Sequence, residues 1–384
     1  MASSISYLWR DRKAASGFRS GVSLHSHTNQ SRETLKFLAK FGSQYPFMRP
    51  LMARLERRSE ANHGMPVNYA ASYWTPPMPP RLAFELERGQ IEELGLEPMV
   101  SLTDHDSITA PLMLQALWSG QPGPVSVEWS VPYGPQSFHL GVHNLPNSAA
   151  QDWMNVLAEH TAHPDDRRRN EIFAALHAQP DVLVVFNHPM WDLYLVGREK
   201  HAALLKEFMG KYRPWIDALE LNGLRNWNEN RAVVQLAEKW DMTLISGGDR
   251  HGVEPNANIN LTNADSFEEF VHEIRHEKKS DILFMPQYAL PWKHRILRSA
   301  IDAVRYYPHF PRGTQRWDER VYHPDASGVQ RPLSDLWPDG TAPWVMTACI
   351  ALVQLMGRGV VSGGLRFAWS ESNELRVALG DYER

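Results

Sequence analysis

The chain has 384 residues, enough for one large α/β domain with an appendage or for two domains. An apolar share of 43% and a charged share of 22% are typical of a soluble globular protein. The formal net charge of −4 argues against general binding to long nucleic acid or to anionic membranes. A small phosphorylated substrate is still compatible with this charge, because metals and a few local arginines suffice to bind it.

The cysteine content and the apolar runs exclude further classes of protein. The single cysteine, Cys349, excludes a disulfide framework within the chain and a thiolate zinc site, and it fits a cytoplasmic protein. The N-terminal MASSISYLWRDRKAASG carries charges where a signal peptide needs an apolar core. The late run PWVMTACIALVQLMG is short and contains Gln354, so it predicts a buried or amphipathic helix and no membrane association. No sequence feature fixes the oligomeric state.

Short β-rich runs alternate with amphipathic helical segments from about residue 21 to 276. The helical segments RRRNEIFAALHAQ, REKHAALLKEFMGKY, NENRAVVQLAEKW and SFEEFVHEIRH have apolar residues three and four apart. This alternation favours a mainly parallel sheet, either open or closed into a barrel. Candidate strands lie at 22–24, 98–103, 124–129, 137–143, 181–188, 216–222 and 242–248.

Two segments interrupt the alternation. Residues 28–97 form a long insert after the first strand, with the Pro- and aromatic-rich centre NYAASYWTPPMPP. The insert is either a lid or specificity element at the rim or a peripheral helical pair. Residues 280–384 form a partly helical C-terminal extension of unknown role, so we divide the chain into a hydrolase unit at 1–279 and this extension.

Polar side chains with metal-binding chemistry stand at or just after the ends of the predicted strands. His25 and His27 are two apart on a strand, so both imidazoles point to the same face. Asp104 and His105 follow the next strand, although Asp106 in the same cluster could simply cap the following helix. Each pattern alone is weak.

Later strands add further candidates of the same kind. In GGDRH, Asp249 and His251 share a face and offer an oxygen and a nitrogen, a set suited to zinc, manganese or iron. Glu128 emerges from an apolar strand, where a buried carboxylate must be paired or metal-bound. His188 closes the run VLVVFNHP. Polar residues from several strand ends assemble the active sites of TIM-type barrels, so a barrel-like fold is favoured.

Taken in order, these motifs resemble those of the PHP family, which is named for its polymerase-associated and histidinol phosphatase members. The HxH, DH, strand-end Glu, FHxLG-like His, His before Pro and DxH motifs all occur, over roughly residues 20–275. The resemblance implies an α/β fold, namely a distorted TIM-like (β/α)7 barrel. It also implies two or three divalent ions, Zn, Mn or Fe, and a phosphoesterase activity in which a metal-activated hydroxide attacks phosphorus.

The resemblance also assigns individual residues. It implies that Glu128 bridges two ions and that Asp104 orients an imidazole. Catalytic roles fall to His139, His188 and Asp249. The implied metal ligands are His25, His27, His105, Glu128, His139, His188, Asp249 and His251.

One stretch departs from the family pattern. Many members carry an Asp in an SDG-like motif a few residues after the HxH, whereas this chain reads TNQSRETL. Asn29 or Glu33 could substitute, but neither falls at the expected offset. The choice between two and three ions therefore stays open.

Three polar residues at the same rim are candidates for binding the substrate. Asn222 and Arg225 follow the strand DALELNG, where an arginine could hold a phosphate with two hydrogen bonds. A local cap or salt bridge explains Arg225 equally well. Arg250 lies between two ligands, although strand alternation would turn it away from their face.

The leading hypothesis is a phosphoesterase acting on a small phosphorylated metabolite or nucleotide. An amidohydrolase-like reaction on a non-phosphate bond is the alternative within enzymes, because the same metal chemistry serves it. A non-catalytic metal-binding scaffold is the alternative outside them.

Overall fold

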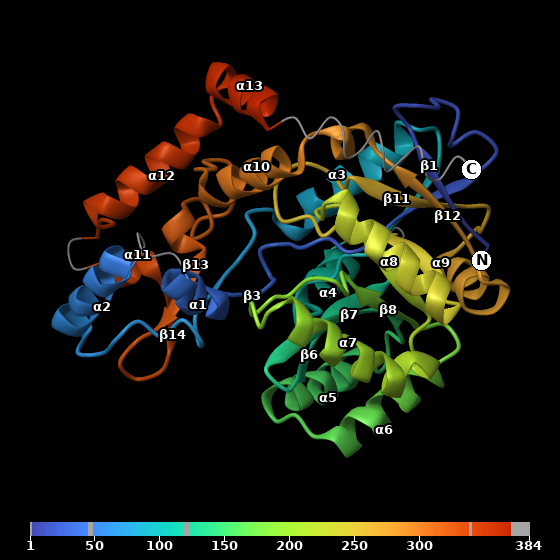
Figure 1. The fold of residues 1–384 in the computed structure, drawn as a ribbon, viewed down its shortest axis with the longest axis horizontal. Coiled ribbons are helices and arrows are strands. Elements are labelled where there is room, and N and C mark those ends of the chain that lie inside the picture. Colours follow the sequence, from blue (N-terminus) through green and yellow to red (C-terminus); the bar gives the residue numbers. More distant parts are fainter. Residues whose placement is uncertain (1, 45–48, 118–122, 338–339, 370–384) are drawn as a thin grey trace.

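The computed structural model describes residues 2–44, 49–117, 123–337 and 340–369, so the end of the predicted extension, 370–384, lies outside the described residues. Two five-stranded sheets and one four-stranded sheet form its β-structure. Figure 1 shows helices packed around the two larger sheets and a separate lobe at the left. The mixed α/β class expected from the strand–helix alternation is confirmed.

The first sheet has the strand order β1-β12-β11-β2-β5. Its strands are β1 (Ala2–Tyr7), β12 (Lys279–Phe284), β11 (Asn258–Thr262), β2 (Ser20–Ser23) and β5 (Glu97–Val100). β2 and β5 are parallel, whereas β11 runs antiparallel to both of its neighbours. β12 pairs with β1 and β11, so this sheet continues across the predicted division at residue 279.

The second sheet has the order β10-β9-β8-β7-β6. Its strands are β10 (Thr243–Gly247), β9 (Ala218–Asn222), β8 (Leu183–Asn187), β7 (Gln136–Leu145) and β6 (Val125–Tyr133). β8, β9 and β10 are parallel, as predicted, but β7 is antiparallel to β6 and β8. The beginning of β7 therefore lies at the same edge as the ends of its neighbours.

The described strands form no closed barrel, which corrects the expected (β/α)7 barrel to a pair of sheets. Among the described residues, β-pairing between the two sheets is limited to isolated bridges, between Ser26 and Arg250 and between His105 and Glu128. β2 and β5 have four residues each, so residues of the loops after them make these contacts. The bridges still bring the ends of β2, β5 and β10 together with β6 at one edge.

Helices connect and cover these strands. α3 (Pro80–Glu92) leads from the insert back to the first sheet and contacts β2 and β5. α5 (Ala150–Ala162) contacts β6, α6 (Asp166–His177) contacts β8, and α8 (Trp227–Trp240) contacts β9. The other α-helices described in this part are α4 (Thr109–Leu117), α7 (Arg198–Tyr212) and α9 (Phe267–His272).

The insert and the C-terminal extension share the third sheet, of order β14-β13-β4-β3. β3 (Glu33–Thr34) and β4 (Tyr73–Trp74) come from the insert, and β13 (Val321–Pro324) and β14 (Gln330–Pro332) from the extension. The lobe at the left of Figure 1 therefore combines blue and orange segments that are far apart in the sequence. Its helices are α1 (Lys36–Gln44), α2 (Arg49–His63) and α11 (Leu333–Leu336).

Three further helices of the extension are α10 (Trp292–Val304), α12 (Trp344–Met356) and α13 (Gly359–Ala368). α12 forms the helix expected from PWVMTACIALVQLMG, but it is not a buried helix, because each of its residues is exposed or half-buried. Within the described ranges, no helix combines the length and the apolar character that crossing a bilayer requires.

Acid titration of one core histidine tests the packing of α5 on β6. His160 is buried, and its ring lies edge-on to Trp129 at 5.3 Å. Burial, together with the charge of Arg169, lowers the pKa of His160 from 6.5 to about 4. Because the folded-state pKa lies below the unfolded value, the unfolded chain takes up the proton first as the pH falls. The free energy of unfolding is therefore highest above pH 6.5 and decreases as the pH falls to about 4.

We expect His160→Leu to reduce the loss of stability between pH 7 and pH 4, by up to about 3 kcal/mol relative to the wild type. Urea unfolding of both proteins across this pH range measures the difference. His272→Leu is the matched control, because the side chain of His272 is 61% exposed. A parallel pH dependence of the wild type and His160→Leu would contradict the assignment.

Candidate metal centre

The eight predicted ligands converge at the edge where the isolated bridges join the two sheets. His139 joins them because β7 begins at this edge, where His139 lies opposite Asn187 of β8. All eight side chains are buried or nearly so. They are His25 and His27 after β2, His105 after β5, Glu128 in β6, His139 in β7, His188 after β8, and Asp249 and His251 after β10.

Three of these residues have a backbone conformation that side chains other than glycine rarely adopt. The φ angles are 62° at His25, 28° at His188 and 56° at Asp249. Such conformations cost of the order of 1–3 kcal/mol each and are concentrated at functional sites. His25 and His27 therefore converge through a left-handed residue after β2, and not through the regular strand alternation that the sequence suggested.

The carboxylate of Glu128 lies at the middle of the cluster. Its Oε2 is 3.1 Å from His25 Nε2, 3.3 Å from His27 Nε2 and 3.2 Å from His105 Nε2. Its Oε1 faces the other way, 3.1 Å from His188 Nε2 and 3.5 Å from His139 Nδ1. The two oxygens thus serve two different sets of imidazoles.

Glu33, one of the two residues that could substitute for the expected Asp, belongs to a second group. Its Oε2 lies 3.2 Å from both His105 Nε2 and His251 Nε2. Ser31 donates a hydrogen bond of 2.6 Å to its Oε1 and fixes the carboxylate. The ligand atoms of His27, Glu33, His105 and His251 lie within 4.8 Å of one another. The spacing between the HxH motif and Glu33 differs from the family pattern, but β3 brings the Glu33 carboxylate next to His105 and His251.

Glu220, in β9, was missed by the sequence reasoning. Its Oε1 lies 2.5 Å from His25 Nδ1, and its Oε2 accepts the His188 N–H at 2.7 Å. A carboxylate in this position fixes the orientation of a ligating imidazole. The signal was available, because Glu220 interrupts an apolar strand just as Glu128 does.

The two glycines of GGDRH make room for this arrangement. A Cβ on Gly247 would overlap the carboxylate of Glu220, and one on Gly248 would overlap the side chain of Asn256. The motif therefore carries two roles, since its glycines admit neighbouring polar groups and Asp249 and His251 provide ligand atoms.

The protonation of the imidazoles in the cluster is mixed. Although burial opposes it, nearby carboxylates raise the pKa of His105 to about 10 and raise those of His25 and His251, so a cation bound to these three would displace protons. Burial lowers the pKa of His27 to about 3 and that of His139 to about 4, so both imidazoles are neutral at pH 7. Burial alone would raise the pKa values of the carboxylates, but the surrounding histidines hold those of Glu33, Glu128 and Asp249 well below their ordinary values.

These residues fit divalent metal ions. His25 Nε2 and His27 Nε2 lie 3.1 Å apart beside Glu128 Oε2, so neutral imidazoles would face each other with their lone pairs unless a proton or a cation lay between them. Glu128 Oε2, His105 Nδ1 and His139 Nδ1 are buried and have no hydrogen-bond partner among the described residues. Imidazole nitrogen mixed with carboxylate oxygen suits zinc, manganese or iron.

Asp104 contacts a different group from the one expected. Its carboxylate accepts the Thr28 N–H at 2.5 Å and the Thr28 hydroxyl at 2.7 Å. It therefore fixes the turn next to His27, whereas Glu220 contacts an imidazole directly.

Of the three predicted substrate-binding residues, two are engaged within the protein. Arg250 donates to Glu87 Oε1 at 2.7 Å and to the carbonyl oxygens of Gly252 and His27. Asn222 donates to Glu220 at 2.9 Å and to Asp249 at 3.2 Å, so it orients carboxylates of the site.

Arg225 lies beside the cluster. Its Nη2 is 3.5 Å from Asp249 Oδ2, and its guanidinium lies 3.8 Å above the ring of Trp191. Trp191 in turn contacts His188 and His139, at ring distances of 5.0 and 6.1 Å. A positive charge is thus held beside the imidazoles of β7 and β8.

Comparison with known proteins finds similarity at the level of solved structures. No family model matches the chain, and no curated protein matches it. A two-domain protein from Bacteroides vulgatus, named for a predicted PHP-like metal-dependent phosphoesterase, has a TM-score of 0.39 and 13% identity, over 70% of this chain and 66% of that one.

Two further structures are similar to part of the chain. A candidate metal-dependent phosphoesterase from Bifidobacterium adolescentis has a TM-score of 0.31 and 17% identity, over 51% of this chain and 90% of that one. An amidohydrolase from Chromobacterium violaceum, with bound sulfate and no metal, has a TM-score of 0.34 and 13% identity, over 60% of this chain and 88% of that one. Proteins named as PHP-like phosphoesterases are thus among the structures that this chain resembles.

Replacing Glu33 tests the second group directly. We expect Glu33→Gln to lower the metal content by one ion per chain, because the amide cannot supply the charge that His105 and His251 face. Elemental analysis of the purified protein measures the stoichiometry. Glu93→Gln is the control, because Glu93 is exposed. A wild-type metal content in Glu33→Gln would show that Glu33 holds no ion.

Proposed function

We propose that this chain is a PHP-like metal-dependent phosphoesterase, which removes phosphate from a small phosphorylated metabolite or nucleotide. The convergence of Glu128 with imidazoles from β2, β5, β7 and β8 carries the proposal. Bound divalent ions supply a Lewis acid and lower the pKa of coordinated water, which is the chemistry that phosphoester hydrolysis needs at neutral pH. Zinc, manganese and iron each suit this set of donors.

The residues divide into three ion-binding groups in this proposal. Glu128 can serve two of them, since its Oε2 faces His25 and His27 while its Oε1 faces His188. Asp249 Oδ1, 3.6 Å from His25 Nε2 and 3.5 Å from His27 Nε2, belongs to the first group. The second group is Glu33, His105 and His251, and the third is His139, His188 and Glu128.

In this proposal Arg225 holds the phosphate. A guanidinium can donate two parallel hydrogen bonds to phosphate oxygens. The stacking on Trp191 fixes its plane, and its Nε has no hydrogen-bond partner among the described residues. Trp191, on which the guanidinium lies, also contacts the rings of His139 and His188, so a phosphate held by Arg225 would lie beside these two imidazoles.

Phosphate release with added metal is the direct test of the activity. We expect turnover of a panel of small phosphoesters with Mn²⁺, Zn²⁺ or Fe²⁺, and a loss of more than about 100-fold in His188→Ala, because even partners of metal ligands contribute 10–100-fold. His272→Ala, at an exposed position, is the control. Bound metal without turnover of any phosphoester, or turnover of amide substrates alone, would contradict the phosphoesterase.

Arg225 can be tested separately from the metal ligands. We expect Arg225→Gln to raise KM for phosphate monoesters by about tenfold or more, with unchanged metal content, because charge-assisted hydrogen bonds to the phosphate are lost. Arg225→Lys should recover only part of the loss, since lysine cannot form the paired hydrogen bonds. Arg198→Gln is the exposed control. An unchanged KM in Arg225→Gln would remove this residue from the substrate site.

A further inference from the structure

A cavity of about 620 Å³ lies between α10 and α13, outside the metal centre. Its walls come from residues 253–254, from one face of α10 and from one face of α13. A volume of this size can hold a small metabolite. Three arginines line it: Arg298 and Arg305, from α10 and the residue after it, and Arg366 from α13.

Positive charge exceeds negative charge around this cavity. Two carboxylates face it, of which Glu254 pairs with Arg298 and Asp302 lies 3.7 Å from Arg305. Asp302 also accepts the Val253 N–H at 3.0 Å, so part of its charge is satisfied by the backbone. No ion pair of Arg366 occurs within the described residues.

Neutral donors complete the cavity wall. His294 is 6% exposed, its Nε2 lies 3.0 Å from Ser362 Oγ, and its Nδ1 has no hydrogen-bond partner in the described part of the chain. Ser362 lies in the first turn of α13, where the helix dipole is positive. The Ser362 hydroxyl and the start of α13 thus lie at the same wall as the arginines, a setting that favours an oxyanion.

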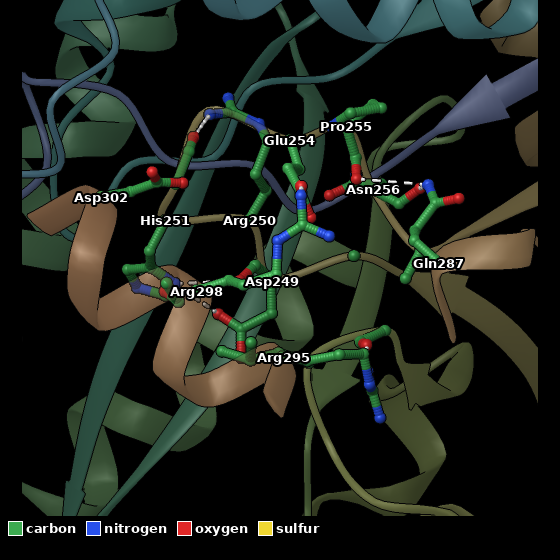
Figure 2. Close-up of a pocket in the computed structure, with 16 residues that line it drawn as sticks. Asp249, Arg250, His251, Glu254, Pro255, Asn256, Gln287, Arg295, Arg298 and Asp302 are labelled. Atoms are coloured by element: carbon green, nitrogen blue, oxygen red, sulfur yellow. Dashed lines mark hydrogen bonds and ion pairs between the residues drawn. The ribbon is translucent and has the colours of Figure 1, made fainter. Parts of the chain in front are cut away.

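The cavity adjoins the pocket that borders the metal centre. Asp249 and His251 line that pocket together with Glu254, Arg298 and Asp302, and the last three residues also line the cavity (Figure 2). An occupant of the cavity would therefore contact the same α10 side chains that face the metal-binding residues.

We propose that the cavity between α10 and α13 binds a phosphate group of a small molecule, held by Arg298, Arg305 and Arg366. Arginines bind phosphate oxygens with paired, charge-assisted hydrogen bonds, and three of them can surround one phosphate group. The phosphate comes either from a separate molecule or from the far end of a substrate that carries two phosphates. The site rests on the cavity and does not depend on the proposed activity.

Calorimetric titration of the metal-loaded full chain with inorganic phosphate tests the site. We expect two binding events, one lost on removal of the metals and one weakened at least tenfold in the double variant Arg305→Gln/Arg366→Gln. Arg358→Gln, an exposed arginine of the same extension that does not line the cavity, should keep both events. The single variant Arg366→Gln, at an exposed side chain, should show the same effect more weakly if the double variant does not fold.

The two sources of the phosphate give different kinetics. If the KM of the double variant rises for bisphosphorylated sugars but not for para-nitrophenyl phosphate, the cavity binds the second phosphate of the substrate. If the KM values of both kinds of substrate are unchanged and the second binding event is lost, the cavity binds a separate molecule. A single event in the wild type that vanishes with the metals, or a wild-type titration in the double variant, would overturn the proposal whether or not the chain hydrolyses phosphoesters.

Discussion

The buried carboxylate of Glu128 is the constraint on which the rest of the centre depends. A carboxylate in a dry interior costs several kcal/mol unless opposite charge and hydrogen bonds surround it. Imidazoles reach Glu128 from strands of both sheets, and Asn187 donates to its Oε1 at 2.9 Å. The edge where the sheets meet is therefore the one place where these groups can satisfy one another.

The backbone at this edge is shaped to serve the side chains. His25, His188 and Asp249 take up left-handed conformations just after their strands end. The hydrogen bonds from Gly248 N–H to the Leu24 carbonyl oxygen, and from Asp249 N–H to that of His25, hold two of these turns against each other. The two turns are thus fixed as a pair, and the cost of their conformations is offset by the packing of the sheets behind them.

Much of this centre could be predicted from the sequence, because ligands that follow successive parallel strands are brought together by the strands themselves. All seven predicted strands exist, and the side chains of the eight predicted ligands lie in one cluster. The closed barrel was wrong because the loops after β2 and β5 contribute single bridges in place of long ladders. Glu33 could not be assigned, since its position depends on pairing between β3, β4 and β13, which no local pattern reveals. Glu220 could have been found, by the argument applied to Glu128.

The shared sheet of the insert and the extension has a consequence for biosynthesis. β3 carries Glu33, β4 carries Trp74, whose ring lies 5.9 Å from that of His251, and both strands belong to a sheet that β13 completes. A ribosome makes β3 and β4 long before β13. The sheet that holds Glu33 against His105 and His251 can therefore be completed only after residue 324 has been synthesised. Full assembly of the centre therefore follows synthesis of the first part of the extension, although all of its ligands are made earlier.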